Sequence, residues 1–195
     1  MRLLFTLVFM MLSMLIANAS AADDSEGALG ELALSNDTLQ LRYINNATQL
    51  AGETTQLQGT VFLSEDRDLV LSAGVLLPVD FRLGNLSVSF GPQIYAALLN
   101  EENNDIMAIS AGAKVRYLVL PGINLAVAGE AFYAPDILTF GSADNLTDLS
   151  ARVEIGLSSR VIAFGGMRWF DIDLTEGGGT RTLQEEAFVG FGYRF

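Results

Sequence analysis

Residues 147–158 alternate without interruption between two kinds of side chain, and this alternation constrains the fold more than any other feature of the chain. The odd positions from 149 to 157 hold leucine, alanine, valine and isoleucine, whereas the even positions from 148 to 158 are charged, small or hydroxylated. Because successive side chains of a β-strand point to opposite faces, this pattern predicts a strand with a different solvent on each side. Residues 106–119, 86–98 and 54–64 alternate in the same way.

The chain can be divided into ten consecutive predicted strands, which indicates an all-β fold. The expected strands are 28–34, 38–45, 53–64, 68–79, 86–99, 106–119, 123–133, 147–159, 161–172 and 182–195. Most of them reach the roughly 9–11 residues that a tilted strand needs to cross a bilayer. Compact turns such as 120–124 alternate with longer acidic or glycine-rich loops such as 134–148, which is the layout of outer-membrane barrels.

These strands and connections predict a closed antiparallel up-and-down transmembrane β-barrel of about ten strands. Segments 28–34 and 38–45 are separated by Ser-Asn-Asp, which suits a tight turn. Fusing the two segments would give an odd number of strands, whereas bacterial single-chain barrels have even numbers. A barrel of eight strands, with residues 28–45 outside its wall, is the alternative.

The first 21 residues predict a secretory signal peptide, which leaves residues 22–195 to form the barrel. Arg2 supplies the positive end, an apolar run over residues 3–16 follows, and small residues suited to a signal peptidase come next. The apolar run is too short to span a bilayer comfortably as a helix. Cleavage is expected after Ala21, with Ala19 and Ala22 as alternatives.

The last predicted strand indicates which solvent lies on each side of the sheet. Its apolar face carries aromatic and aliphatic residues at every second position from 187 to 195, whereas Gly190, Gly192 and Arg194 share the opposite face. The pattern predicts lipid outside and a polar lumen inside. A soluble periplasmic β-protein that carries a lipid-like ligand would instead need apolar residues inside and polar residues outside. Four outward residues also resemble the terminal signal that the outer-membrane assembly machinery recognises: Val189, Phe191, Tyr193 and Phe195.

The stretch GEAFYAPDILTFGSADN, residues 129–145, resembles the YfaZ family of small outer-membrane proteins. In the corresponding segment of that family, an aromatic pair, a small residue and Pro-Asp follow Gly-Glu. Residues 71–100, with a short turn between two strands and a tyrosine near the end of the second, are also similar to the family. The resemblance covers most of the chain after residue 50. It implies a β-barrel in the outer membrane, and it implies no activity.

Seven charged residues on inward-facing positions form the candidate site. In a narrow barrel we expect them to pair across the interior, because an unpaired buried charge is strongly destabilising. A charged lining of a small channel is the alternative interpretation. The alternation around position 168 is weak, so the direction of that side chain stays open. The seven residues are Arg42, Lys114, Arg116, Glu130, Arg152, Glu154 and Arg168.

The sequence predicts neither an enzyme nor a site for a cofactor or a metal ion. Histidine and cysteine are absent, which removes the commonest general base and the commonest transition-metal ligands. Glu185 and Glu186 are adjacent in a predicted strand and would point to opposite faces. Residues 171–179 lack the spaced oxygen ligands of an EF-hand loop. The net charge of −12 argues against a nucleic-acid partner, since phosphate binding needs a basic surface.

Together these features predict a small monomeric protein of the bacterial outer membrane with a structural or surface-interaction role. Its lumen is expected to be plugged by polar side chains, and a narrow porin-like channel for small solutes is the alternative. The expected partners are outer-membrane lipid, lipopolysaccharide and the outer-membrane assembly machinery.

Overall fold

The computed structural model describes residues 27–50, 53–79, 84–100, 104–175 and 179–195, so the predicted signal peptide and its cleavage site lie outside the described residues. No helix in these ranges is long and apolar enough to cross a membrane. The elements are β1 (Leu29–Leu34), β2 (Thr38–Leu50), β3 (Glu53–Ser64), β4 (Leu69–Val79), β5 (Leu86–Leu99), β6 (Asn104–Leu120), the 3-10 helix η1 (Pro121–Ile123), β7 (Leu125–Ala134), the 3-10 helix η2 (Asp136–Leu138), β8 (Thr139–Gly141), β9 (Ala143–Gly156), β10 (Val161–Leu174) and β11 (Thr180–Arg194).

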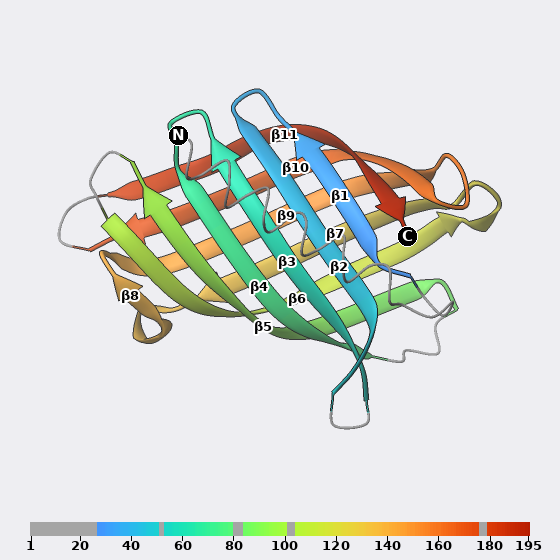
Figure 1. Cartoon of the computed structure of the whole chain (residues 1–195), viewed down its shortest axis with the longest axis horizontal. Coiled ribbons are helices and arrows are strands. Elements are labelled where there is room, and N and C mark those ends of the chain that lie inside the picture. The colour runs from blue at the N-terminus through green and yellow to red at the C-terminus, as the bar shows by residue number, and fades with distance from the viewer. Residues whose placement is uncertain (1–26, 51–52, 80–83, 101–103, 176–178) are drawn as a thin grey trace.

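The strands close into a barrel (Figure 1). Neighbours pair antiparallel in the order β5-β4-β3-β2-β1-β11-β10-β9-β7-β6, and a further pairing of β5 with β6 completes the ring. The predicted closed antiparallel barrel of ten strands is therefore confirmed, with the short β8 added to it. The eight-strand alternative is wrong, because β1 pairs with both β2 and β11 and so lies within the wall.

One part of the wall is built from two consecutive strands, β7 and β8. β7 ends at Ala134, where Pro135 follows and has no N–H to donate to a sheet. β6 continues past this point, and β8 supplies the pairing partners of its residues 106–108. The predicted loop over residues 134–148 is therefore wrong in part. The backbone groups of β6 beyond the end of β7 need hydrogen-bond partners, which β8 supplies. In addition, β9 already begins at Ala143.

The hairpin of β2 and β3 is longer than the alternation predicts. β2 continues to Leu50 rather than ending at residue 45, and a register shift lies between Asn45 and Thr48. The two strands remain paired up to Leu50 and Glu53, and their hairpin extends beyond the neighbouring turns in Figure 1. The sequence signal fails here because residues 45–49 are mostly polar at odd and even positions alike.

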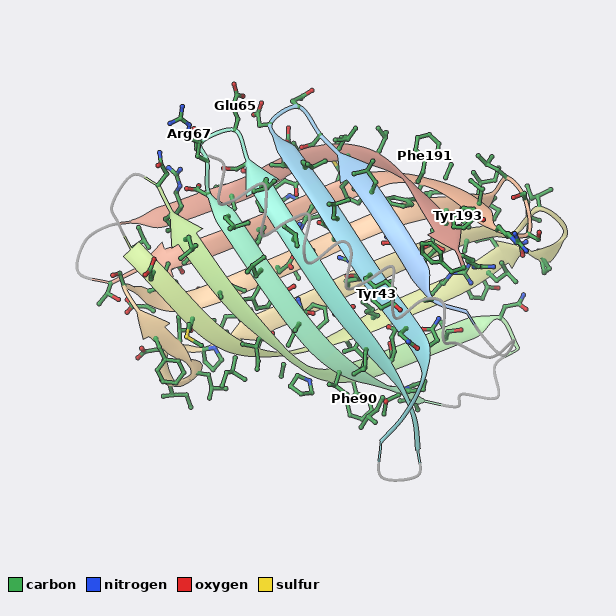
Figure 2. The ribbon with its side chains drawn as sticks, in the orientation of Figure 1. Tyr43, Glu65, Arg67, Phe90, Phe191 and Tyr193 are labelled. Atoms are coloured by element: carbon green, nitrogen blue, oxygen red, sulfur yellow. The ribbon has the colours of Figure 1, made fainter. Side chains whose placement is uncertain are left out.

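Both described ends of the chain lie at the same end of the barrel, which we call the terminal end. The amide of Phe195 donates to the carbonyl of Ala28 at 2.9 Å, and the amide of Arg194 donates to the carbonyl of Arg160 in the β9–β10 turn at 2.8 Å. The opposite end, which we call the loop end, includes the β3–β4 turn with Glu65 and Arg67 (Figure 2). This arrangement follows from an even number of wall strands.

The two faces of the sheet differ as the alternation predicts. Val153 is 51% exposed on the outside, whereas the adjacent Glu154 is 4% exposed inside. Phe90, Phe191 and Tyr193 project from the outer surface (Figure 2). Large apolar side chains are exposed on this surface from β1 to β11, which is the opposite of a water-soluble barrel.

The interior also contains an apolar core, which the sequence analysis did not predict. Phe62, Tyr95 and Phe170 are fully buried, and the ring centroids of Phe62 and Phe170 lie 5.7 Å apart in an edge-to-face arrangement. A smaller cluster around Phe164 and Phe188 fills another part of the lumen. Apolar as well as polar side chains thus project into the lumen, as expected for small barrels.

Candidate functional site: the charged lumen

Six of the seven predicted lumen residues belong to one ion-pair network inside the barrel. Glu130 lies between two cations, with N···O distances of 2.6 Å to Arg42 and 3.3 Å to Lys114. Arg42 is also 3.9 Å from Glu31, which the sequence analysis did not include. These contacts join β1, β2, β6 and β7 across the lumen.

Arg152 of β9 connects the rest of this network. Its two terminal nitrogens donate to the two carboxylate oxygens of Glu31 at 2.9 and 2.8 Å, and its Nε donates to Glu154 at 2.9 Å. The guanidinium group also lies 4.7 Å from the ring centroid of Phe164. Arg116 of β6 donates from Nε to the second carboxylate oxygen of Glu154 at 2.7 Å.

The network is nearly balanced in charge and mostly withdrawn from water. It holds four basic and three acidic groups, and the Glu31 side chain is 2% exposed, whereas that of Arg116 is 37% exposed. Burial of these ions is tolerable only because each has a partner of opposite sign. We call this set the lumen network: Glu31, Arg42, Lys114, Arg116, Glu130, Arg152 and Glu154.

Arg168 points into the lumen as well, but it belongs to a separate cluster. Its Nε and one terminal nitrogen each donate to Asp148 at 2.9 Å, and its other terminal nitrogen donates to Gln40. The guanidinium carbon lies 5.0 and 4.6 Å from the ring centroids of Phe62 and Phe170. This cluster combines one ion pair with aromatic packing, so it fills space as well as neutralising charge.

Asp148 has a third donor, the hydroxyl of Tyr95, at 2.9 Å. The arginine, the aspartate and Tyr95 are all buried, and they come from β10, β9 and β5 on different sides of the barrel. Together they cross the lumen. We call this set the arginine layer: Gln40, Phe62, Tyr95, Asp148, Arg168 and Phe170.

Neutral side chains make further contacts within the lumen. Gln58 of β3 donates to Gln93 of β5, and Gln93 donates to Ser72 of β4 at 3.1 Å. The hydroxyl of Ser110 on β6 donates to the backbone carbonyl of Gln93 at 2.9 Å. These bonds hold four consecutive wall strands to one another from the inside.

A cavity of about 400 Å³ lies in the lumen at the terminal end. Every wall strand contributes to its lining, from Leu29 of β1 to Arg194 of β11. Five members of the lumen network are among its lining residues: Lys114, Arg116, Glu130, Arg152 and Glu154. We call this cavity the vestibule.

A second hollow of about 260 Å³ lies at the loop end and is strongly acidic. Its lining includes Asp66, Asp68, Glu185 and Glu186, and Arg181 is 3.1 and 2.9 Å from the carboxylates of Asp66 and Asp68. Glu185 is exposed whereas Glu186 is turned inward toward Ser35. Among the described residues, no group of three or more acidic side chains is arranged to hold a metal ion.

The four residues of the proposed assembly signal all lie on the outer face of β11 or directly after it. Val189 and Phe191 are more than half exposed, and the rings of Tyr193 and Phe195 lie 5.2 Å apart, edge to face. Their inward neighbours Phe188, Gly190 and Gly192 are buried. The structure thus gives this segment one continuous apolar outer surface.

Sequence reasoning missed two acidic residues that complete the site, Glu31 and Asp148. Both positions carried a usable signal. Positions 30, 32 and 34 share the outward face of the first strand, so the side chain of Glu31 must point inward. Asp148 lies on the polar face of residues 147–158. The alternation of residues 54–64 also places Phe62 on the inward face, whereas Phe170 could not be assigned because the alternation around it is weak.

The barrel is similar to solved outer-membrane structures at low sequence identity. A structure described as a bacterial polysaccharide outer membrane secretin matches with a TM-score of 0.52 and 14% identity, over 89% of this chain and 67% of that one. The outer membrane channel DcaP of Acinetobacter baumannii matches with a TM-score of 0.41 and 9% identity, over 89% of this chain and 60% of that one. The first match supports the barrel fold and nothing finer.

No curated protein is similar enough in sequence to count as a match. The family model described as YfaZ precursor matches residues 8–195, which is nearly the whole chain. This match agrees with the resemblance seen over residues 71–100 and 129–145 and extends it to the first strands. The chain belongs to the YfaZ precursor family.

Proposed function

We propose that this protein is a small monomeric barrel of the bacterial outer membrane, with a structural or surface-interaction role and a lumen closed to solutes. The observation that carries the proposal is the arginine layer. Tyr95, Phe62 and Phe170 are 0–1% exposed, and Arg168 is paired with Asp148 among them. Side chains packed this closely leave no space for a hydrated solute to pass.

The outer surface supports the proposed location. Large apolar residues are exposed on the wall strands other than β2, whose described side chains include none, and aromatic residues such as Tyr117, Tyr133 and Trp169 are among them. Outward apolar belts with aromatic residues near their edges are typical of barrels in lipid. Outer-membrane lipid and lipopolysaccharide are then the surrounding partners, and the outer face of β11 is the part offered to the assembly machinery.

A narrow porin-like channel is the second candidate, and the vestibule is the observation that favours it. The vestibule brings solvent-sized space into the lumen from the terminal end. The seven lumen residues predicted from the sequence are five basic and two acidic, an excess that would favour anions in such a channel. Glu31 and Asp148 raise the acidic count to four, so any such preference should be weak.

Conductance of the purified wild-type protein in planar lipid bilayers tests the proposal. We expect no stable open steps, while a general porin reconstituted under the same conditions conducts and shows that insertion occurs. Co-flotation with lipid vesicles verifies that the wild type inserts, and heat-modifiable mobility on gels verifies that it is folded. Persistent, reproducible single-channel steps from the folded wild-type barrel would contradict a closed lumen and support the channel.

A further inference from the structure

The vestibule has the lining of a binding site, and we propose that it binds small hydroxylated anions, of the size of a monosaccharide that carries one carboxylate or phosphate. Its volume of about 400 Å³ lies within the range of small-molecule pockets. Binding of such an anion does not depend on the proposed structural role. Only the direction of access, from the periplasm, rests on the proposed membrane orientation, in which termini and short turns face that side.

The charge of the lining selects anions. Four cationic side chains line the vestibule, Lys114, Arg116, Arg152 and Arg194, against the two carboxylates Glu130 and Glu154. This local surplus of positive charge occurs in a chain whose net charge is −12. Cations in a recess with protein walls attract an anion more strongly than the same cations would on an open surface.

Arg116 has the donors that an anion would contact. Only its Nε is engaged, with Glu154 at 2.7 Å, and among the described residues its two terminal nitrogens have no hydrogen-bond partner. It is also the most exposed member of the lumen network, with 37% of its side chain accessible. A guanidinium group presents paired donors that match a carboxylate or a phosphate.

The rest of the lining suits a ligand with hydroxyl groups. Gln56 donates from Nε2 to Asn46 at 2.5 Å, while its Oε1 is buried without a hydrogen-bond partner in the described structure. A buried acceptor without a donor is unfavourable, and a ligand hydroxyl would satisfy it. The hydroxyl groups of Ser87 and Ser89 line the same space.

Isothermal titration of the folded barrel in a non-ionic detergent tests this inference. We expect D-glucuronate and glucose 6-phosphate to bind at low ionic strength, with affinity that falls as salt is added, and D-glucose to bind at least about tenfold more weakly. Binding by only one of the two anions would identify the preferred anionic group. Absence of binding by both, or equal affinity for glucose, would overturn the proposal.

Arg116→Gln provides the matched variant, because Glu154 keeps Arg152 as a partner at 2.8 Å and the network stays paired. It should weaken glucuronate binding by roughly tenfold, since a charged hydrogen-bond donor is removed. Arg160→Gln makes the same charge change in the exposed β9–β10 turn outside the vestibule and should bind as the wild type does. Equal losses in the two variants would refute a site at Arg116.

The outcome can be separated from that of the conductance test. A wild type that conducts and binds glucuronate would refute the closed lumen and keep the site. A silent barrel that binds neither anion would refute the site and keep the closed lumen.

Discussion

Replacing Arg152 by alanine should destabilise the barrel far more than the same change at Arg116, although both arginines contact Glu154. Arg152→Ala removes both hydrogen bonds to Glu31 and the contact with Phe164. Glu31 would then keep only Arg42, at 3.9 Å, and stay 2% exposed in the described structure. Breaking a buried pair in this way costs about 3–5 kcal/mol.

Arg116→Ala should cost about 1 kcal/mol or less, because the side chain is partly exposed and contributes a single ion pair. Glu154 remains paired with Arg152 in that variant. The two changes remove the same atoms, so their difference reflects the buried contacts of Arg152, chiefly its two hydrogen bonds to Glu31.

Denaturant unfolding in lipid vesicles measures both variants. Trp169 is the single tryptophan of the chain and lies partly exposed on the outer face of β10, so its fluorescence reports the loss of lipid contact. Adding Glu31→Gln to Arg152→Ala should restore part of the stability, with a coupling of roughly 1–3 kcal/mol. Equal destabilisation by the two alanine variants, or no recovery in the double variant, would refute the reasoning.

Two further predictions concern the outer face. Leu149 lies near the middle of β9 and is 41% exposed on the outside. Leu149→Arg should lower the unfolding free energy by roughly 2–4 kcal/mol, and Ser150→Arg, on the inward face, should lower it less; equal losses would mean that the outer solvent is not lipid. Phe195→Asp should reduce the heat-modifiable, folded fraction in cells more than Phe140→Asp, which alters an equally exposed aromatic residue at the loop end, and equal folded fractions would argue against an assembly signal at the last residue.

Much of the wall could be predicted because period-two alternation is a local property of the backbone. β9 shows this clearly, since polar and apolar residues separate without exception over residues 148–157. Alternation gives no contrast where the interior is itself apolar. On β10, Ile162, Phe164 and Phe170 all point inward, so the sequence does not show which face carries Arg168.

The internal partners could be predicted less well, because they depend on which strands face each other across the lumen. Alternation assigned Arg152 to the interior but could not show that Glu31, in the first strand, lies opposite it. It also could not predict that β8 would continue the wall after Pro135, since that depends on the length of β6 beside it. Register and closure across the ring are non-local, and a single sequence records them only indirectly.

The lumen network also has a consequence for the order in which the barrel assembles. Arg152 and Glu31 are 121 positions apart in sequence, and Arg42 and Glu130 are 88 apart. Neither pair can form until β1 and β2 have come together with β7 and β9 around the ring, and contacts of such long range form slowly. Before closure, each of these charges would meet hydrocarbon alone, at a cost of about 2.5–3.5 kcal/mol per charged side chain or more. Sheets that lack either end of the chain should therefore stay in water, and insertion should proceed as a single concerted event.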